Sequence, residues 1–330
     1  MNEELSKATP SAPAAVSGDS PFHRGELAIQ ERLGIVEKMD KYGRVGIRDF
    51  LLEQHREFFP KLPFFVVGSV DGRGRPWASL LVGEPGFLHS SDPKRLHVAA
   101  IPSDGDPLKG ALREGASIGG LGIELYTRRR NRINGKVLLD EDGSGFTIKV
   151  DQSFGNCPQY IQARKPRFVR ELSGQTQPRS LRGFERFDDD IRTVIRRADT
   201  FFIASRFEGD ETTARNGVDV SHRGGRPGFL TVKDDRTLLW PDYRGNFFFM
   251  TLGNLECDPR CGLLVMDFDS GDTLQLTGTA KVLWDWPKDD PAFQDAHRLV
   301  QFTLSDGLHA KGVLPFAWDF LGQAPQFLSG

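Results

Sequence analysis

The second half of the chain repeats the first, and this repeat constrains the fold more than any other feature of the sequence. FFVVGSV, which starts at Phe64, resembles FFIASRF, which starts at Phe201. GEPGFLHSSDPKRLHV resembles GRPGFLTVKDDRTLLW, EGASIGGLGIEL matches ECDPRCGLLVMDF in position, and INGKVLLD matches LTGTAKVLWD. The segments keep their order at a period of roughly 135 residues, which is the length of a domain and too long for a solenoid repeat. The sequence therefore predicts two homologous domains in tandem.

Each repeat has the pattern of short strands joined by tight turns. FFVVGSV and WASLLVG flank the turn sequence DGRGRP, which is the pattern of a β-hairpin. With 36 glycines and 20 prolines, the chain is rich in residues that form turns. We therefore expect a mainly β protein made of two β-barrels with peripheral helices. Further strands of the first repeat are predicted at residues 94–101, 117–125, 132–140 and 145–154.

The boundaries of these units follow from changes in composition and periodicity. The N-terminal stretch is rich in Ala, Pro and Ser and cannot bury a core, so it is expected to be disordered. Apolar residues at helical spacing then predict a helical lead-in, for example Ile47, Phe50, Leu51 and Phe58. The predicted units are a tail over residues 1–20, the lead-in and first barrel over 21–170, a linker with a short helix over 171–198, and the second barrel over 199–330.

Composition argues against several classes of protein. The 43 basic and 45 acidic residues nearly balance, which disfavours a nucleic-acid binder or a ligand of anionic membranes. No apolar run approaches the roughly 18 residues of a transmembrane helix, and no secretory signal is recognisable. Three cysteines form no disulfide framework, so we expect a cytoplasmic protein. No metal-binding, hydrolase or dinucleotide-binding signature is present in the sequence.

Two motifs of the second repeat have the residue types that bind a phosphate. In GGRPGFLTV, residues 224–232, the glycines allow a planar ligand or a phosphate to approach the backbone, and Arg226 can pair with a phosphate through its forked donors. In DYRGNFFFMTLGNL, residues 242–255, a cation, a bare backbone and a side-chain amide follow one another as Arg244, Gly245 and Asn246. The alternatives are a plain hairpin turn for the first motif and an exposed loop for the second.

Two motifs of the first repeat are also candidates. SFGNCPQYIQAR, residues 153–164, places Gln159 and Tyr160 where they can bond the edge of a ring and stack on its face, unless Pro158 begins a helix there. TRRRNRING, residues 127–135, has four arginines in six positions, which suggests binding of a polyanion. Because alternate residues of a strand face opposite sides, a solvated β-ribbon is the favoured interpretation of this motif.

Taken together, these motifs resemble the pyridoxamine 5'-phosphate oxidase-like family of split-barrel flavoproteins. The resemblance covers roughly residues 20–320 and rests on GRPWASLLVG, SFGNCPQYIQAR, GRPGFLTV and YRGNFFFMTLGNL. It is strongest for a group of relatives that contains NCPQYIQAR and opens with a segment like SPFHRGE. The resemblance implies two split β-barrels of the FMN-binding type, with FMN bound at the rim of a barrel across a domain or subunit interface.

The resemblance also implies site residues and partners. The second barrel would be the principal holder of FMN, because the matching segment of the first, DGDPLKG, has only Lys109 as a cation. A separate electron-transfer reductase is an expected partner, and the two barrels either form a pseudo-dimer within the chain or pair further into a homodimer. The residues implied at the flavin are Arg226, Gly228, Phe229, Leu230, Thr273 and Gln275, with Arg244, Gly245 and Asn246 at the phosphate and Ser79, Gln159 and Tyr160 contributed by the first barrel.

The resemblance favours an FMN-dependent oxidoreductase of unknown substrate. No residue stands out in the sequence as a catalytic acid or base, so a non-enzymatic flavin carrier or sensor is an alternative. A barrel that holds haem or a deazaflavin is another, with His222 as a candidate axial ligand of a haem.

Overall fold

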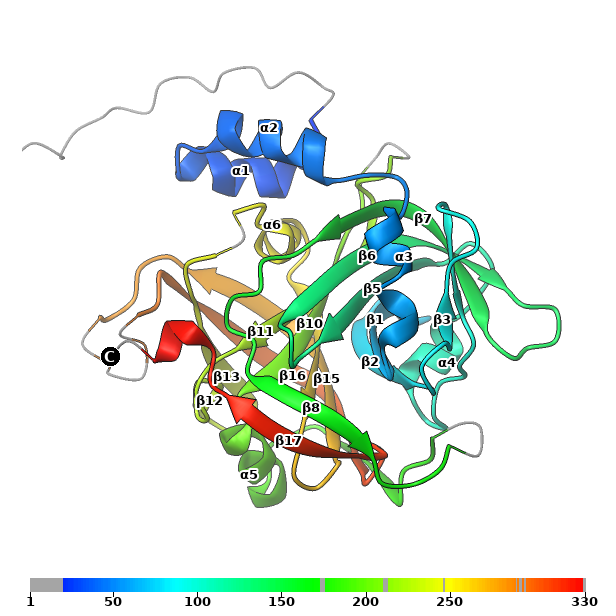
Figure 1. The fold of residues 1–330 in the computed structure, drawn as a ribbon. Coiled ribbons are helices and arrows are strands. Elements are labelled where there is room, and N and C mark those ends of the chain that lie inside the picture. Colours follow the sequence, from blue (N-terminus) through cyan, green and yellow to red (C-terminus); the bar gives the residue numbers. More distant parts are fainter. Residues whose placement is uncertain are drawn as a thin grey trace, which may run out of the picture.

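The computed structural model describes residues 20–172, 176–209, 213–245, 247–288, 290, 293 and 295–328. The tail predicted for residues 1–20 lies outside this range except for Ser20. Two antiparallel sheets dominate the molecule and lie against each other, with helices at its periphery (Figure 1). The prediction of a mainly β fold with two split-barrel units is confirmed, although neither sheet closes on itself.

The two sheets have the same topology, strand for strand. The first runs in the order β2-β1-β5-β6-β7-β4-β3, and the second in the order β11-β10-β14-β15-β16-β13-β12. The first sheet consists of β1 (Phe64–Val70), β2 (Pro76–Val82), β3 (Leu88–His89), β4 (Arg95–Val98), β5 (Ser117–Glu124), β6 (Arg129–Leu139) and β7 (Phe146–Gly155). The second consists of β10 (Thr200–Phe207), β11 (Gly217–Gly224), β12 (Thr231–Val232), β13 (Thr237–Asp242), β14 (Arg260–Met266), β15 (Thr273–Leu283) and β16 (Arg298–Lys311).

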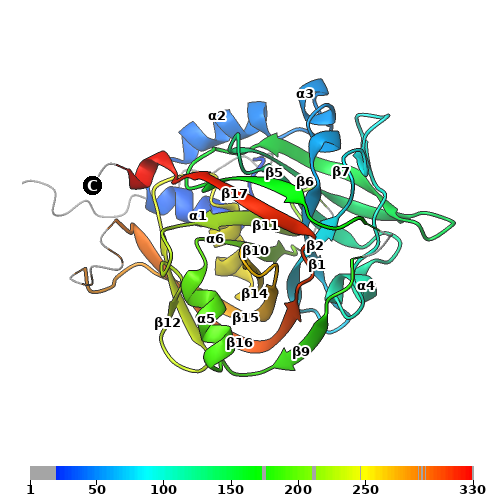
Figure 2. The same ribbon diagram turned by 60° about the horizontal axis from the view of Figure 1, so that its bottom comes forward.

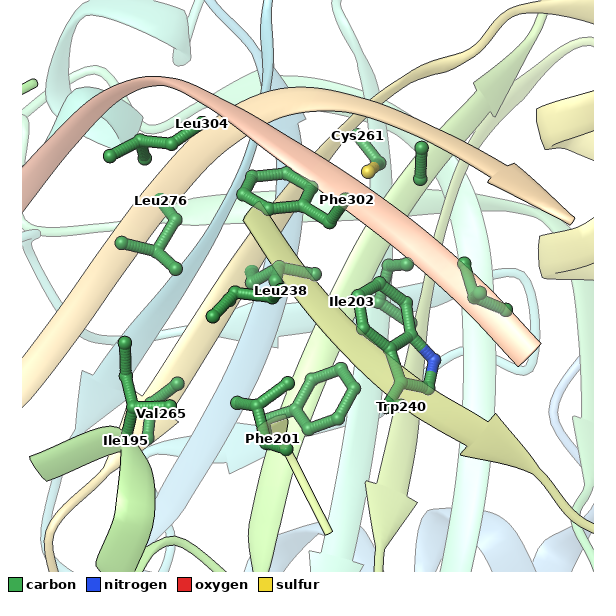
Figure 3. Packing of buried hydrophobic residues seen from close by; sticks show 14 of the residues in the cluster. Ile195, Phe201, Ile203, Leu238, Trp240, Cys261, Val265, Leu276, Phe302 and Leu304 are labelled. Carbon is green, nitrogen blue, oxygen red and sulfur yellow. The ribbon is translucent and has the colours of Figure 1, made fainter. Parts of the chain in front are cut away.

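Alternation along the central strands divides the apolar residues between two kinds of core. On β10, Phe201 and Ile203 point into the second barrel, where they pack with Trp240 of β13 and Phe302 of β16 (Figure 3). The intervening Phe202 and Ala204 belong to a different cluster, which lies between the barrels. Because both faces of β10 are buried, its sequence is a continuous apolar run with no polar alternation.

Two glycines allow the barrels to approach each other closely. A Cβ added to Gly119 of β5 would lie 2.4 Å from the carbonyl oxygen of Val218 on β11, and one added to Gly262 of β14 would lie 2.5 Å from that of Pro76 on β2. The two contacts are counterparts, since each joins one sheet to the second hairpin strand of the other. Backbone therefore packs on backbone across the junction, and a larger residue at either position would push the barrels apart.

The helices lie outside this pair of sheets. The lead-in folds as α1 (Arg24–Arg32) and α2 (Val36–Gly46), with α1 packed on α6 (Met250–Cys257), followed by α3 (Glu53–Arg56) and η1 (Phe59–Lys61). The helix expected around Ile47–Leu51 is absent, because this segment is extended and Arg48 pairs with Ser153 of β7. The remaining helices are α4 (Pro107–Ala111), α5 (Asp189–Arg197) and η3 (Pro325–Phe327).

Three strands join the ends of the repeats and were not predicted. β8 (Ala163–Phe168) and β17 (Phe316–Gly322) form a two-stranded ribbon across the front of the molecule (Figure 2), and β9 (Ser180–Phe184) pairs with β16 from within the predicted linker. These strands pair with segments that are distant in the chain, so no local hairpin pattern marks them. None of the helices in the described part of the chain has the length and apolarity needed to cross a membrane.

Candidate functional site

The shared topology creates two equivalent clefts at the junction of the barrels. Gly119 faces Asn134 of β6, and its counterpart Gly262 faces Thr277 of β15. Two and four residues before this pair on β6 and β15, the equivalent positions of the two repeats are Arg132 and Gln275, and Arg130 and Thr273. In the same way, the pairs Gly68–Ala78 and Ala204–Val220 match Ser79, Leu80 and Leu81 of β2 with Ser221, His222 and Arg223 of β11.

One cleft, here called the basic cleft, is built from both barrels. β6 and the loop after β7 supply one wall, while β11, β13 and the start of α6 supply the other. It encloses about 720 Å³ of empty space, part of which is open to solvent. Its lining residues are Arg130, Arg132, Cys157, Gln159, Tyr160, Ser221, His222, Arg223, Gly224, Phe229, Pro241, Asp242, Tyr243, Gly245, Phe249, Met250, Thr251 and Leu252.

Three arginines concentrate positive charge in the basic cleft. Burial, and then the neighbouring guanidiniums of Arg223 and Arg132, lower the pKa of Arg130 to about 9. Burial also lowers the pKa of Arg132 and of Arg223. Within the described ranges neither Arg130 nor Arg223 forms an ion pair; their recorded bonds go to the backbone carbonyls of Cys157 and His222. Arg130 and Arg223 are half-buried cations without carboxylate partners, an arrangement that is costly and is typical of a site that binds an anion.

The buried polar atoms of the cleft include several with no partner. Both ring nitrogens of His222 and the Nε of Arg132 lack a hydrogen-bond partner in the described structure. Burial, followed by the charges of Arg130 and Arg223, lowers the pKa of His222 well below its usual value, so the imidazole is neutral. Most buried polar groups in native proteins are hydrogen-bonded, so this concentration of unsatisfied atoms indicates that a ligand completes the site.

The start of α6 adds backbone donors to the same cleft. Met250, Thr251 and Leu252 line it, and their N–H groups belong to the first turn of the helix, where no intrahelical acceptor exists. Phe249 caps the helix in a left-handed conformation, with φ of 60°, and provides no side-chain acceptor. An uncapped helix start beside three guanidiniums is suited to a phosphate or another anion.

The equivalent cleft, here called the acidic cleft, is closed by its own side chains. The carboxylate of Asp106 accepts hydrogen bonds from the backbone N–H of Leu108 at 2.8 Å, from Ser79 Oγ at 2.6 Å and from Gln275 Nε2 at 3.1 Å. An internal carboxylate thus caps α4, whereas the start of α6 is left open. The positions of Arg130, Arg132 and His222 are taken here by Thr273, Gln275 and Leu80, while Leu81, the counterpart of Arg223, packs in the core of the first barrel; among the described residues no arginine, lysine or histidine lines this cleft.

An aromatic cluster borders the mouth of the basic cleft. The rings of Tyr160 and Tyr243 stack with centroids 5.0 Å apart, and Phe327 of η3 packs on both. The Tyr160 hydroxyl donates to the carbonyl of Arg244 at 2.6 Å, which joins the loop after β7 to the loop before α6. A flat apolar wall next to a cationic floor is suited to a ligand with a planar ring and a phosphate.

A buried network holds Arg132 from behind. Its guanidinium donates to Asp219 at 3.0 Å and to Ser221, and the other oxygen of Asp219 accepts from Asn254 of α6 at 2.9 Å. Asn254 also pairs with His23, the residue that caps α1, at 2.8 Å. The N-terminal helix therefore contributes to positioning the floor of the cleft, although it does not line it.

The structure brings four of the residues expected from the sequence into the basic cleft: Phe229, Gly245, Gln159 and Tyr160. Arg226 does not line it; this side chain is exposed, and its guanidinium donates to the carbonyl of Phe327 at 2.6 Å. Gly228 and Leu230 flank Phe229 in the same turn but are not lining residues. Arg244 is exposed outside the cleft, and Asn246 lies outside the described residues.

The three remaining expected residues lie in the acidic cleft. Thr273 and Gln275 line it, and Ser79 bonds Gln275 at 3.0 Å. These three residues therefore lie on β2 and β15, which are the counterparts in the other repeat of β11 and β6 at the basic cleft. The arginines of TRRRNRING supply the cationic floor, contrary to the solvated ribbon expected there, because Arg130 and Arg132 share the face of β6 that turns toward the second barrel. The sequence did contain a signal for this, because two arginines at positions i and i+2 of a strand lie on the same face of the sheet.

Comparisons with known proteins agree with this fold. Residues 187–307 match the family model described as pyridoxamine 5'-phosphate oxidase. No curated protein sequence matches the chain.

Similar solved structures each match a little over a third of the chain. A protein related to general stress protein 26, of the pyridoxinephosphate oxidase family, from Clostridium acetobutylicum is 10% identical, with 40% of this chain and 92% of that chain covered and a TM-score of 0.28. A FAD-binding protein from Mesorhizobium loti is 12% identical, with 39% and 98% covered and a TM-score of 0.25. HutZ from Vibrio cholerae, described as a haem storage protein, is 14% identical, with 39% and 96% covered and a TM-score of 0.27. The family model thus matches the second barrel, and this part of the chain is similar to the pyridoxamine 5'-phosphate oxidase family.

Proposed function

We propose that the protein binds one FMN per chain in the basic cleft and acts as a flavin-dependent oxidoreductase. The observation that carries this proposal is the group of three arginines and the open start of α6, which face unpartnered polar atoms in a cleft that both barrels line. In this proposal Arg130 and Arg223 bind the phosphate, and the first-turn N–H groups of α6 assist them. The ring system lies toward Tyr160, Tyr243 and Phe229 at the apolar wall.

The remaining residues position the ligand and exclude water. A bound flavin would supply the acceptor for hydride or single electrons, which no side chain of the cleft can provide. Neutral His222 offers one donor and one acceptor to the edge of a ring, and the Arg132–Asp219 pair holds the neighbouring floor in place. Asp242 is bonded to Arg298, whose Nε and one terminal nitrogen both lie 2.9 Å from the same carboxylate oxygen, so this pair fixes the far wall of the cleft.

Titration of the purified protein with FMN tests the proposal. We expect quenching of flavin fluorescence with saturation at one FMN per chain, because the acidic cleft has no cations. Saturation at two would show that the acidic cleft also binds, and failure to bind FMN at all would refute the proposal. Oxidation of NADH or NADPH by the loaded protein, with oxygen or a dye as acceptor, would separate an oxidoreductase from a carrier that binds flavin without turnover.

One observation favours haem as a second candidate ligand. His222 is 3% exposed, lines the basic cleft and has both ring nitrogens unpartnered, as a neutral axial ligand requires. The arginines would then bind the haem propionates. A Soret band that disappears in His222→Leu, which carries the residue of the acidic cleft, would support haem, and a haem spectrum unchanged by this substitution would exclude His222 as the ligand.

A further inference from the structure

A second groove lies outside the basic cleft and shares a wall with it. It runs under α2, between this helix, α3, the end of β7 and the loop before α6, and encloses about 1290 Å³ of empty space that includes its open side. Phe154 separates the two sites, because the guanidinium of Arg132 lies 5.3 Å from one side of its ring and the ring of Phe248 lies 6.3 Å away. Pockets for small ligands measure roughly 300–1,000 Å³, so the groove has room for one.

The walls of this groove are apolar and unusually exposed. Met39, Tyr42 and Val45 repeat every three residues along α2 and line it from one face of the helix. Tyr42 is 55% exposed and Val45 is 67% exposed, and Phe247 on the opposite side is 38% exposed. Contiguous exposed apolar side chains on a soluble protein mark a binding surface more often than isolated ones do.

The charged residues that line the groove are cations. They are Lys38 and Arg48, and neither forms an ion pair with a described residue. Arg48 is fixed by backbone bonds to Ser153 in both directions, at 3.1 and 2.6 Å, and its side chain donates to the carbonyl of Gly46 at 3.0 Å. Most of the guanidinium fork therefore remains available for a ligand on a rigid support.

His55, beside Arg48, has a pKa that is lowered in part by the positive charge around the groove. Burial, and then the charges of Arg129 and Arg48, lower the pKa of His55 to about 4. Arg129 is directed away, with its guanidinium 4.5 Å from the ring of Phe58 and a bond to the carbonyl of Gln54. The groove thus combines apolar walls with a fixed cation and a neutral imidazole, and no aspartate or glutamate lines it within the described residues.

We propose that this groove is a binding site for an apolar carboxylate of small-molecule size, with its hydrocarbon against Tyr42, Val45 and Phe247 and its carboxylate on Arg48. Charge complementarity selects an anion over an amine, because each cation of the lining would repel a positive head group. The forked donors of Arg48 match the two oxygens of a carboxylate. This site is distinct from the proposed FMN site and does not depend on it.

Isothermal titration of the whole protein with dodecanoate, below its micellar concentration, tests this site. We expect saturable binding of one dodecanoate per chain and at least tenfold weaker binding of dodecylamine, which has the same hydrocarbon and the opposite charge. Equal affinity for both compounds, or no binding of dodecanoate, would overturn the proposal.

Two substitutions locate the site. Arg48→Gln should weaken the binding of dodecanoate at least tenfold and should strengthen that of dodecylamine, because it removes a cation that repels the amine. Arg44→Gln is the matched control, since Arg44 lies on α2 outside the groove, four residues from Arg48, and is paired with Asp40 at 2.7 Å. Equal losses in both variants would refute the assignment. A parallel FMN titration of Arg48→Gln should give the wild-type result, so that failure of this site and failure of the FMN site are distinguishable.

Discussion

Arg130→Thr is the most informative perturbation of the basic cleft. The matching position of the acidic cleft is Thr273, so the fold already accepts threonine there. If Arg130 binds the FMN phosphate, the substitution removes a charge-assisted hydrogen bond worth about 1.5–3 kcal/mol. At about 1.4 kcal/mol for each tenfold change, the Kd of FMN should rise about 10- to 150-fold. Riboflavin lacks the phosphate, so its Kd should change less than about threefold, well under 1 kcal/mol.

The same substitution should stabilise the protein without ligand. Burial, and then the charges of Arg223 and Arg132, lower the pKa of Arg130 to about 9, so at pH 7 the folded state bears the full cost of holding this cation. At about 1.4 kcal/mol per pKa unit this cost is several kcal/mol, which the packing of the long side chain offsets in part. We expect a net gain of about 1 kcal/mol and a rise in Tm of about 2–4 °C.

Flavin fluorescence titration and thermal unfolding measure these two effects. Arg244→Ala is the control, because Arg244 is an exposed arginine outside the cleft and should bind FMN as the wild type does. Equal losses of FMN and riboflavin in Arg130→Thr would remove Arg130 from the phosphate. A selective loss of FMN in Arg244→Ala with none in Arg130→Thr would restore the phosphate site expected from the sequence and refute the basic cleft.

Three further substitutions test the junction and its titrating groups. Gly262→Val should lower the unfolding free energy by more than about 2 kcal/mol, because its Cβ would meet the carbonyl of Pro76 at 2.5 Å. Gly110→Val is the control: its Cβ has open space around it, so only the smaller propensity effect of a helical position is expected. Similar denaturation midpoints for the two variants would contradict this packing. Burial raises the pKa of Asp106 from 3.8 to about 6, so the folded state binds this proton more tightly and loses stability as pH rises from 4 to 6. Asp106→Asn should therefore stabilise the protein by about 1–3 kcal/mol at pH 7.5 and not at pH 4. A gain in stability that is independent of pH would exclude titration of Asp106 as its cause. The pKa of His222 is lowered by burial, so the protein loses stability as pH falls below 6.5 and only the unfolded chain takes up the proton. His222→Gln should therefore make unfolding less sensitive to acid between pH 6.5 and 5. An unchanged dependence of stability on pH would show that His222 is protonated in the folded protein.

Local patterns in the sequence were sufficient for several strands of both repeats, but not for β11 or β16. Apolar runs bounded by turn residues, such as Phe64–Val70 and Thr200–Phe207, coincide with β1 and β10, because both faces of these strands are buried. The predicted short helix coincides with α5, whose Asp188 caps its first turn. The ribbon of β8 and β17 escaped prediction because its strands are distant in the chain and partly exposed.

The candidate site could be predicted only in part, because its residues are divided between the repeats. Gln159, Tyr160, Phe229 and Gly245 were identified from their motifs and do meet in one cleft. Arg226 and Arg244 have the right chemistry in their local motifs, yet their side chains lie outside it. A motif shows which residue types are near one another in the chain, but not which face of a strand meets the other barrel.

The sequence by itself determined the duplication, the strand order within each repeat and the turns, because these depend on periodicity and on glycine and proline. Only the tertiary structure decided which of two equivalent clefts carries the positive charge. The strands are the same in both, but the crossing of the barrels at Gly119 and Gly262 brings β6 to β11 in one cleft and β15 to β2 in the other. Arginine and histidine therefore converge in the basic cleft, while Gln275 and Ser79 close the acidic cleft around Asp106. The chemistry of each cleft depends on contacts between residues more than 80 positions apart in the chain.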